Sequence, residues 1–322
     1  MITRRRLLAA SVAAGTGLMR PAWAETYPDR LIKILVPFTA GGPVDVMARL
    51  VAQHLSTSFG QSVIVDNRPG AGGTIASKAV ATAEPDGYTL LFASAGSLAI
   101  SPALYKNLGY DPVGFTPVAM VANHPLAMVV HPSVPVHSVQ ELIAYARANP
   151  GKLNYAAAPG TPPHLMVELF RSLTDTRLVF IPYKGAAQAL TELLAGQTQM
   201  TMLSTTVIVP SILAGKVRPL AVTSTARWPE LPEVPTMKES GFADFPQGSW
   251  TAVVAPAGTP RAVVAKLNEA INQGLRSVEL RDGLTKLGAE TKIESPEELG
   301  ALLAAETRKW GAVIKSSGAT ID

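Results

Sequence analysis

Short apolar runs recur along the chain from about residue 30 onward, separated by longer segments in which apolar residues are spaced three or four apart. Short apolar runs between turn residues are typical of buried strands, and the wider spacing is typical of helices that pack on a sheet. Alternation of the two favours an α/β fold with largely parallel sheets. The segments that we predict as strands are 32–36, 62–65, 89–92, 126–130, 178–181, 220–222 and 251–255.

Two helix starts carry capping signals. Ser138 is followed three positions later by Glu141, and Ser295 is followed by Glu298 at the same spacing. A serine that accepts from the first amides, with a glutamate that reaches back, stabilises the start of a helix. We therefore predict helices that begin after each serine, the first of them ending at 149–151, where Asn, Pro and Gly follow one another.

The length of the chain after residue 24 suits two domains. No internal repeat, low-complexity tract or flexible linker separates two halves, so short strands must carry the chain between them. We predict that 126–130 leaves the first lobe and that 250–256 returns to it. Lobe 1 then comprises 25–125 and 251–322, and lobe 2 comprises 126–250.

The first 24 residues have the pattern of an export signal. Three arginines at 4–6 precede an uncharged stretch over 7–19, and the Ala-Trp-Ala of 22–24 matches a cleavage site. The uncharged stretch is shorter than the roughly 20 residues that cross a bilayer. We expect export to the periplasm with cleavage after Ala24, by the general secretion route or by the twin-arginine route.

Removal of that segment changes the charge. Four of the 28 lysines and arginines but none of the 24 acidic residues lie in it, so the +4 of the whole sequence falls to zero. A chain with zero net charge and no basic stripe lacks the positive surface that is typical of proteins that bind nucleic acid or an anionic membrane. The absence of cysteine excludes disulfides and thiolate sites. The five histidines are not spaced as metal ligands are, for example as in H-E-x-x-H. We therefore expect neither a metal nor a cofactor.

The first predicted strand leads through a turn rich in proline and glycine into a helix that opens at or just before Asp45. Gly41 and Gly42 can turn several amide groups to one side, and the first helical turn adds further unpaired amides. Such a turn can hold a carboxylate without lysine or arginine. The alternative is an ordinary strand-to-helix turn that Asp45 caps.

Two loops of the same kind lie in lobe 2. Thr161 can cap a helix that takes Pro162 at its first position, which places His164 in the first turn. There the imidazole could donate to an anion, or it could be a packing or capping residue. In the next loop, Tyr183 could line a pocket, whereas we expect Lys184 to be a solvated loop residue.

A set of short motifs runs through nearly the whole chain after the export segment. They are PFTAGGPVDVMAR at 37–49, VDNRPGAGGTIAS at 65–77, PDGYTLLFA at 85–93, PALY at 102–105, PGKLNYA at 150–156, HLMVELF at 164–170, PYKGAAQAL at 182–190, LAVTS at 220–224, LPEVPT at 231–236 and VAPAGTP at 254–260. Together these motifs resemble those of Bug-type (TctC-like) extracytoplasmic solute-binding receptors.

The resemblance implies a periplasmic binding protein fold, type II-like, in which two α/β lobes are joined by short hinge strands and close on a small carboxylate. It also implies that the carboxylate, which could be a dicarboxylate, an amino acid or an aromatic acid, is passed to the membrane permease of a tripartite tricarboxylate transporter. We expect the receptor to be a monomer. By matching position, the resemblance implies the ligand-binding residues Phe38, Ala40, Gly41, Gly42, Asp45, Ser94, Ala95, Gly96, Gly160, Thr161, His164, Tyr183, Lys184, Gly185, Ser204, Thr205 and Thr206.

The loop at 160–163 departs from the family pattern, because prolines stand where glycine and serine are usual before the histidine. Proline has no amide to donate. We therefore expect the hydroxyl of Thr161 and the amides of Gly160 and Thr161 to matter more in this chain than in its relatives.

Other functional classes are less consistent with the sequence. Gly70 and Gly72 begin a G-x-G-x-x-G pattern after a strand, but Ile75 stands where the third glycine should be. No G-x-S-x-G motif or acid-base pair indicates catalysis, so we do not expect an enzyme. A receptor that serves a two-component sensor instead of a permease would have the same binding residues, and this alternative stays open.

Overall fold

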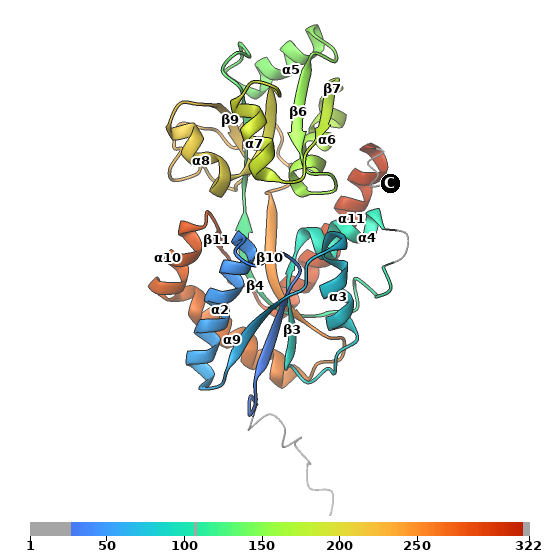
Figure 1. Cartoon of the computed structure of the whole chain (residues 1–322), viewed down its shortest axis with the longest axis vertical. Coiled ribbons are helices and arrows are strands. Elements are labelled where there is room, and N and C mark those ends of the chain that lie inside the picture. Colours follow the sequence, from blue (N-terminus) through green and yellow to red (C-terminus); the bar gives the residue numbers. More distant parts are fainter. Residues whose placement is uncertain (1–26, 106–107, 318–322) are drawn as a thin grey trace, which may run out of the picture.

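The computed structural model describes residues 27–105 and 108–317, so the export segment lies outside the described residues. The chain forms two α/β lobes, one above the other (Figure 1). The two-lobed fold predicted from the sequence is therefore confirmed.

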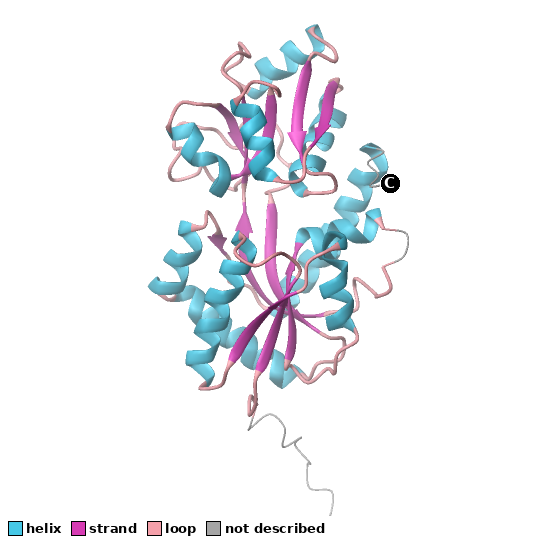
Figure 2. Ribbon diagram, in the orientation of Figure 1, coloured by secondary structure: helices cyan, strands magenta, loops and turns pink. Residues whose placement is uncertain are grey.

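The first lobe is built on a six-stranded sheet with the order β11-β4-β10-β3-β1-β2. Its strands are β1 (Ile32–Val36), β2 (Val63–Asn67), β3 (Thr89–Ser94), β4 (Thr116–His124), β10 (Ser249–Ala255) and β11 (Glu290–Thr291). Its helices are α2 (Pro43–Phe59), η1 (Ala71–Gly73), α3 (Thr74–Ala81), the π-helical turn η2 (Gly96–Ile100), α4 (Ser101–Leu104), α9 (Arg261–Arg276), α10 (Val278–Lys286) and α11 (Pro296–Ser317). Figure 2 shows helices on both sides of this sheet.

The second lobe is built on a five-stranded sheet with the order β7-β6-β8-β5-β9. Its strands are β5 (Leu126–Val130), β6 (Leu153–Ala157), β7 (Leu178–Pro182), β8 (Met200–Ser204) and β9 (Arg218–Val222). Its helices are α5 (Val139–Ala148), α6 (Pro162–Thr174), α7 (Ala186–Leu194) and α8 (Thr205–Leu213).

The sheets are mixed, which corrects the expectation of largely parallel sheets. In the first lobe β1 runs parallel to β2 and β3, but β10 runs antiparallel to both β3 and β4. In the second lobe β5 runs antiparallel to β8 and β9. The reason is that β4 carries the chain out of the first lobe and β10 brings it back, so the returning strand points the opposite way.

Both predicted capping boxes are present. Ser138 accepts from the amide of Glu141 at 3.1 Å and caps α5, and Ser295 accepts from the amide of Glu298 at 3.2 Å at the start of α11. In contrast, β4, β6, β8 and β11 are strands that the apolar pattern did not predict.

A buried carboxylate ties the hinge strand β10 to the last helix. Glu306 of α11 accepts from the indole N–H of Trp250 at 3.3 Å and from that of Trp310 at 2.9 Å. All three residues are buried. Because α11 also contacts α6 of the second lobe, the lobes meet at this helix as well as at the strands that connect them.

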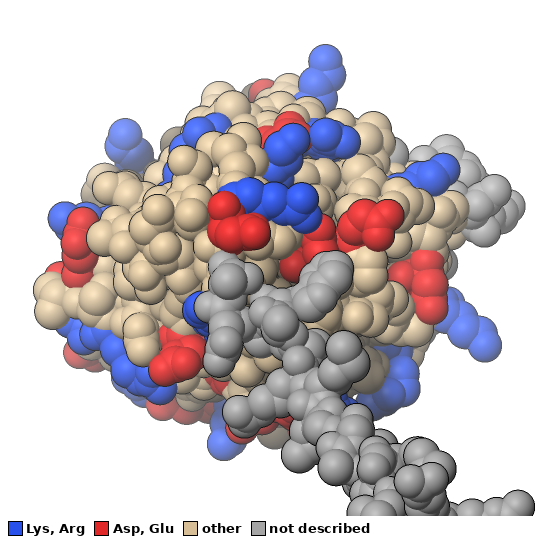
Figure 3. Space-filling view, turned by 90° about the horizontal axis from the view of Figure 1, so that it is seen from below, with Lys and Arg blue, Asp and Glu red and all other residues tan. Residues whose placement is uncertain are grey.

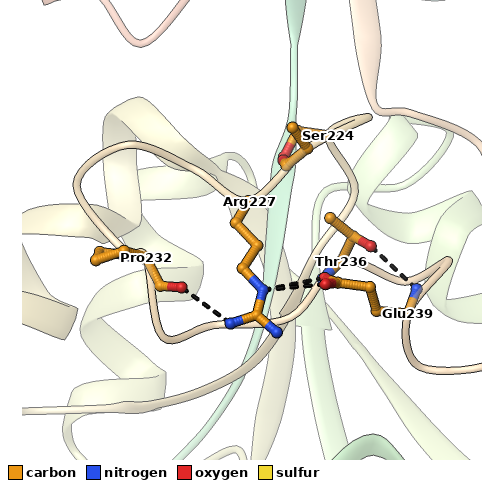
Figure 4. Close-up of polar contacts among 6 residues, drawn as sticks. Ser224, Arg227, Pro232, Thr236 and Glu239 are labelled. Carbon is orange, nitrogen blue, oxygen red and sulfur yellow. Dashed lines mark hydrogen bonds and ion pairs between the residues drawn. The ribbon is translucent and has the colours of Figure 1, made fainter.

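The long segment 223–248 returns the chain from β9 to β10 without a helix or strand, and one cluster of polar contacts organises it (Figure 4). Arg227 donates from Nε to both carboxylate oxygens of Glu239, at 3.1 and 3.2 Å, and from Nη1 to the carbonyl of Pro232 at 3.1 Å. Thr236 and Glu239 exchange hydrogen bonds between side chain and backbone. The amide of Thr236, together with Arg227, holds the pKa of Glu239 below its usual value.

We expect Arg227→Ala to loosen this segment while the lobes stay folded. Exposed ion pairs contribute little to global stability, but this arginine joins two separate parts of the segment. Limited proteolysis should cut 223–248 faster in the variant, with the melting temperature nearly unchanged. Arg281→Ala, which removes a surface ion pair to Asp282 at 3.4 Å, is the control and should not change cleavage. Equal protection in both variants would contradict this role.

Candidate functional site

A cavity of about 310 Å³ lies between the lobes and takes its lining from both. The first lobe contributes Phe38, Pro43, Val44, Met47, Gly72, Ser94, Gly96, Ser101, His124, Ser249 and Thr251. The second lobe contributes Pro159, Gly160, Thr161, Pro162, Ser204, Thr206 and Val207. None of these described residues is a lysine, arginine, aspartate or glutamate, so recognition here depends on hydroxyls, amides and apolar contact.

The carboxylate of Asp45 accepts three hydrogen bonds that fix the shape of the loop between β1 and α2. Its Oδ2 accepts from the amide of Gly41 at 2.8 Å and from Arg49 Nε at 2.9 Å, and its Oδ1 accepts from Asn67 Nδ2 at 2.8 Å. Asn67 Nδ2 also donates to the carbonyl of Phe38 at 3.1 Å. Burial acts to raise the pKa of Asp45, but the hydrogen bonds from Arg49, Gly41 and Asn67 outweigh it and hold the pKa below its usual value.

The start of α2 confirms the prediction of a helix that opens just before Asp45, but it contradicts the alternative in which Asp45 caps that helix. The helix begins at Pro43, with Gly42 as its N-cap and no side-chain capping bond. Asp45 is therefore neither the first helical residue nor the cap, although its carboxylate does accept one amide of the preceding turn. Of the predicted residues in this loop, Phe38 lines the cavity, while Ala40, Gly41, Gly42 and Asp45 lie outside the lining.

The loop after β3 is closed by two serines. The amide of Ser94 donates to Ser97 Oγ at 3.0 Å, and the amide of Ser97 donates to Ser94 Oγ at 3.3 Å. Of the three ligand-binding residues predicted in this loop, Ser94 and Gly96 line the cavity, whereas Ala95 is buried outside the lining.

The loop that opens α6 satisfies its own donors. Thr161 is the N-cap residue, but its hydroxyl donates to the carbonyl of Ala158 at 2.7 Å and makes no capping bond, which corrects the capping role predicted for it. The amide of Thr161 bonds the same carbonyl at 3.3 Å. The amide of Gly160 donates to His164 Nδ1 at 3.3 Å. Gly160 and Thr161 both line the cavity.

His164 lies behind this loop and outside the lining. It is 5% exposed, and its ring stacks on that of Phe180 with the centroids 4.1 Å apart. Burial lowers the pKa of His164, so the ring is neutral at pH 7. Of the two roles left open by the sequence, packing and support of the loop describe this geometry.

The remaining predicted residues divide between the cavity and its surroundings. Ser204 and Thr206 line the cavity, with Oγ and Oγ1 2.5 Å apart. Thr205 is buried and donates from Oγ1 to the carbonyl of Gly288 at 3.3 Å, which joins the second lobe to the first. Outside the lining lie Tyr183, which is half-buried, Lys184, which is exposed, and Gly185.

Several lining residues were not predicted from the sequence. Val44 and Met47 form an apolar wall beside Phe38, and their spacing of three on α2 is a signal that could have found them. His124, Ser249 and Thr251 come from the hinge strands β4 and β10. No local pattern marks these three, because pairing between distant segments brings them together.

No group of three or more His, Asp or Glu side chains among the described residues is arranged to hold a metal ion. None of the helices in residues 27–105 and 108–317 combines the length and apolar character needed to span a bilayer. On the face of the first lobe seen in Figure 3, basic and acidic side chains are interspersed.

Two comparisons of the sequence with known proteins identify relatives of this chain. The sequence profile of the tripartite tricarboxylate transporter family receptors, TctC, matches residues 47–319. Protein BugT of Bordetella pertussis is 38% identical over 311 residues, which are 96% of this chain and 95% of BugT.

Solved structures extend the similarity to the fold. The structure titled R. palustris Rpa4515 with adipate has a TM-score of 0.79 and 39% identity, and covers 91% of this chain and 99% of its own. MatC from Rhodopseudomonas palustris with bound malate has a TM-score of 0.75 and 34% identity, and covers 89% of this chain and all of its own. The resemblance inferred from the motifs is thus confirmed, and the chain belongs to the TctC family of tripartite tricarboxylate transporter receptors, which are periplasmic solute-binding proteins.

Proposed function

We propose that this protein captures a small carboxylate in the cavity between its lobes and delivers it to the membrane permease of a tripartite tricarboxylate transporter. One observation carries the proposal: the N-termini of three helices reach the cavity from both lobes. Pro43 at the start of α2, Pro162 at the start of α6 and Thr206 in the first turn of α8 all line it.

Helix N-termini attract anions because their first amides have no partner within the helix and the peptide dipoles add up. Pro43 and Pro162 have no amide of their own, so the remaining first-turn amides, the peptide dipoles and the hydroxyls of the lining would hold a carboxylate here without a cationic side chain. The two relatives with adipate and malate are consistent with this ligand class. Phe38, Val44 and Met47 would contact the apolar part of the ligand.

Capture also needs a change between open and closed states. We propose that the two lobes flex about the strands near 126 and 250. Only a ligand that contacts both lobes shifts this balance toward closure. The lining from both lobes supports that requirement.

Export completes the proposal. Residues 1–24 would direct the chain to the periplasm and be removed after Ala24, leaving a monomeric receptor. Mass spectrometry of the protein recovered from the periplasm should give the mass of residues 25–322, and a chain that retains Met1 in the cytoplasm would contradict this.

The direct test of ligand class is native mass spectrometry of the mature chain, followed by calorimetric titration. We expect a bound organic acid to be released on denaturation and to rebind at micromolar strength or better, which is about 8 kcal/mol. A panel of neutral analogues, in which an amide replaces the carboxylate, is the control. Equal binding of acids and amides, or no binding of either, would overturn the proposal.

Thr161 gives a sharper prediction within the site. We expect Thr161→Val to weaken carboxylate binding about fivefold, because the loop loses one hydrogen bond worth about 1 kcal/mol. Thr161→Ser keeps the hydroxyl and should bind as the wild type does. Unchanged affinity in Thr161→Val would show that the hydroxyl bond to Ala158 does not support the ligand-binding shape of this loop.

A further inference from the structure

A histidine and two hydroxyl residues share one face of the hinge strands at the cavity. His124 is the last residue of β4 and pairs directly with Ser249 of the antiparallel strand β10. Directly opposed residues lie on the same face of a sheet, and so do residues two apart along a strand. Thr251 therefore shares this face with both, and all three line the cavity.

The hydrogen bond between His124 and Thr251 orients the imidazole at the cavity. His124 Nε2 is 3.0 Å from Thr251 Oγ1, and among the described residues this is the only side-chain hydrogen bond of Thr251. Thr251 is 1% exposed, so its hydroxyl proton is shielded from solvent. A buried hydroxyl that only accepted would leave its own proton unpaired, so we assign the hydroxyl as donor and Nε2 as acceptor. The neutral ring then carries its own proton on Nδ1.

That Nδ1–H group is an unused donor at the cavity. Nδ1 makes no hydrogen bond to any described residue. It is not fully buried either, so it retains accessible surface. Burial lowers the pKa of His124 to about 4, and the ring is neutral at pH 7. The hydroxyl of Ser249, beside it, also makes no hydrogen bond to the described residues.

We propose that His124, oriented by Thr251, is a specificity-determining residue whose Nδ1–H donates to an oxygen at the end of the ligand remote from its helix-bound carboxylate. The inference rests on the proposed function. Because His124 is on a hinge strand and not on a loop that opens a helix, it meets a different part of the ligand. The ligand class is narrowed to acids with a second oxygen acceptor, such as dicarboxylates, in preference to simple monocarboxylates.

The test compares straight-chain dicarboxylates of four to ten carbons with monocarboxylates of the same lengths, by calorimetric titration of the mature chain. We expect the wild type to prefer the dicarboxylate at the best length. His124→Leu should reduce that preference about 10- to 100-fold, the range for a hydrogen bond to a charged acceptor. Affinity for the matched monocarboxylate should stay within about twofold.

Two conservative variants separate recognition from structure. His124→Asn places an amide N–H near the position of Nδ1 and should restore much of the preference. Thr251→Ser keeps the hydroxyl that sets the tautomer, whereas Thr251→Val removes it and should lower the preference. His137→Leu, at an exposed histidine, is the matched control and should match the wild type.

The outcomes distinguish this inference from the proposed function. Equal losses for both acids in His124→Leu, or an unchanged preference, would overturn the role of His124 while leaving carboxylate binding intact. A wild type that binds none of the acids would overturn the proposed function, and the inference with it. Melting temperatures of all variants show whether any loss reflects unfolding.

Discussion

Gly248→Ala is expected to destabilise the protein by about 3 kcal/mol or more and to remove ligand binding. Gly248 has a φ of +113°, and a Cβ atom there would lie 2.2 Å from the carbonyl oxygen of His124 and 2.9 Å from Pro125 Cα. These are backbone atoms of the segment that connects β4 to β5, so neither can move without displacing a hinge strand. The two connections between the lobes pass each other at this point.

The measurement is urea unfolding of both proteins, with binding followed by calorimetry. Gly241→Ala is the matched control, because Gly241 lies in 223–248 like Gly248 and also has a positive φ, of +91°. A Cβ atom added at Gly241 would have no neighbouring atom within 4 Å. It should cost about 1 kcal/mol from backbone strain alone and leave binding unchanged. Equal costs at the two positions would show that the close approach at the hinge is relieved easily.

Asp45→Asn is expected to cost about 2 to 4 kcal/mol of stability and to weaken carboxylate binding by at least tenfold. The asparagine side chain has one accepting oxygen, so it cannot serve Gly41, Asn67 and Arg49 together as the carboxylate does. Because Asp45 is 2% exposed, water cannot replace the lost partners. The loop that presents Phe38 and the start of α2 would lose its fixed shape.

The pH dependence supplies a second readout for Asp45. Its pKa in the folded protein lies below the ordinary value of 3.8, so its stabilising effect is complete above about pH 4 and is lost as the pH falls through the lowered pKa. The stability difference between wild type and Asp45→Asn should therefore narrow on acidification below pH 4. Asp282→Asn, at an exposed ion pair on α10, is the control. A difference that stays constant with pH would contradict the role of the charged carboxylate.

Local chemistry in the sequence determined much of the architecture. The run at 126–130 matches β5 residue for residue, and the capping serines at 138 and 295 stand where two helices begin. Strand patterns, caps and proline or glycine turns act over a few residues, so they can be read without the partner segments. The motifs likewise identified the family and pointed to Phe38, Ser94 and Thr161, which line the cavity.

The tertiary structure decided which side chains face the cavity and which support it. Asp45 and His164 were candidates for ligand contact, but their contacts place them behind the loops, where one accepts the amide of Gly41 and the other accepts the amide of Gly160. Whether any of the predicted residues touches the ligand stays a prediction. Position in a motif does not specify the direction of a side chain, because that depends on packing from other elements.

The part of the cavity lined by the hinge strands β4 and β10 depended on tertiary structure most of all. His124 and Thr251 are 127 positions apart, and only the antiparallel pairing of β4 with β10 brings them within hydrogen-bond distance. That pairing follows from the path of the chain out of one lobe and back again, which no local pattern records. The sequence by itself determined the family, most of the strands predicted from apolar runs and several loops at the cavity, while long-range strand pairing decided which residues of the hinge strands line the cavity.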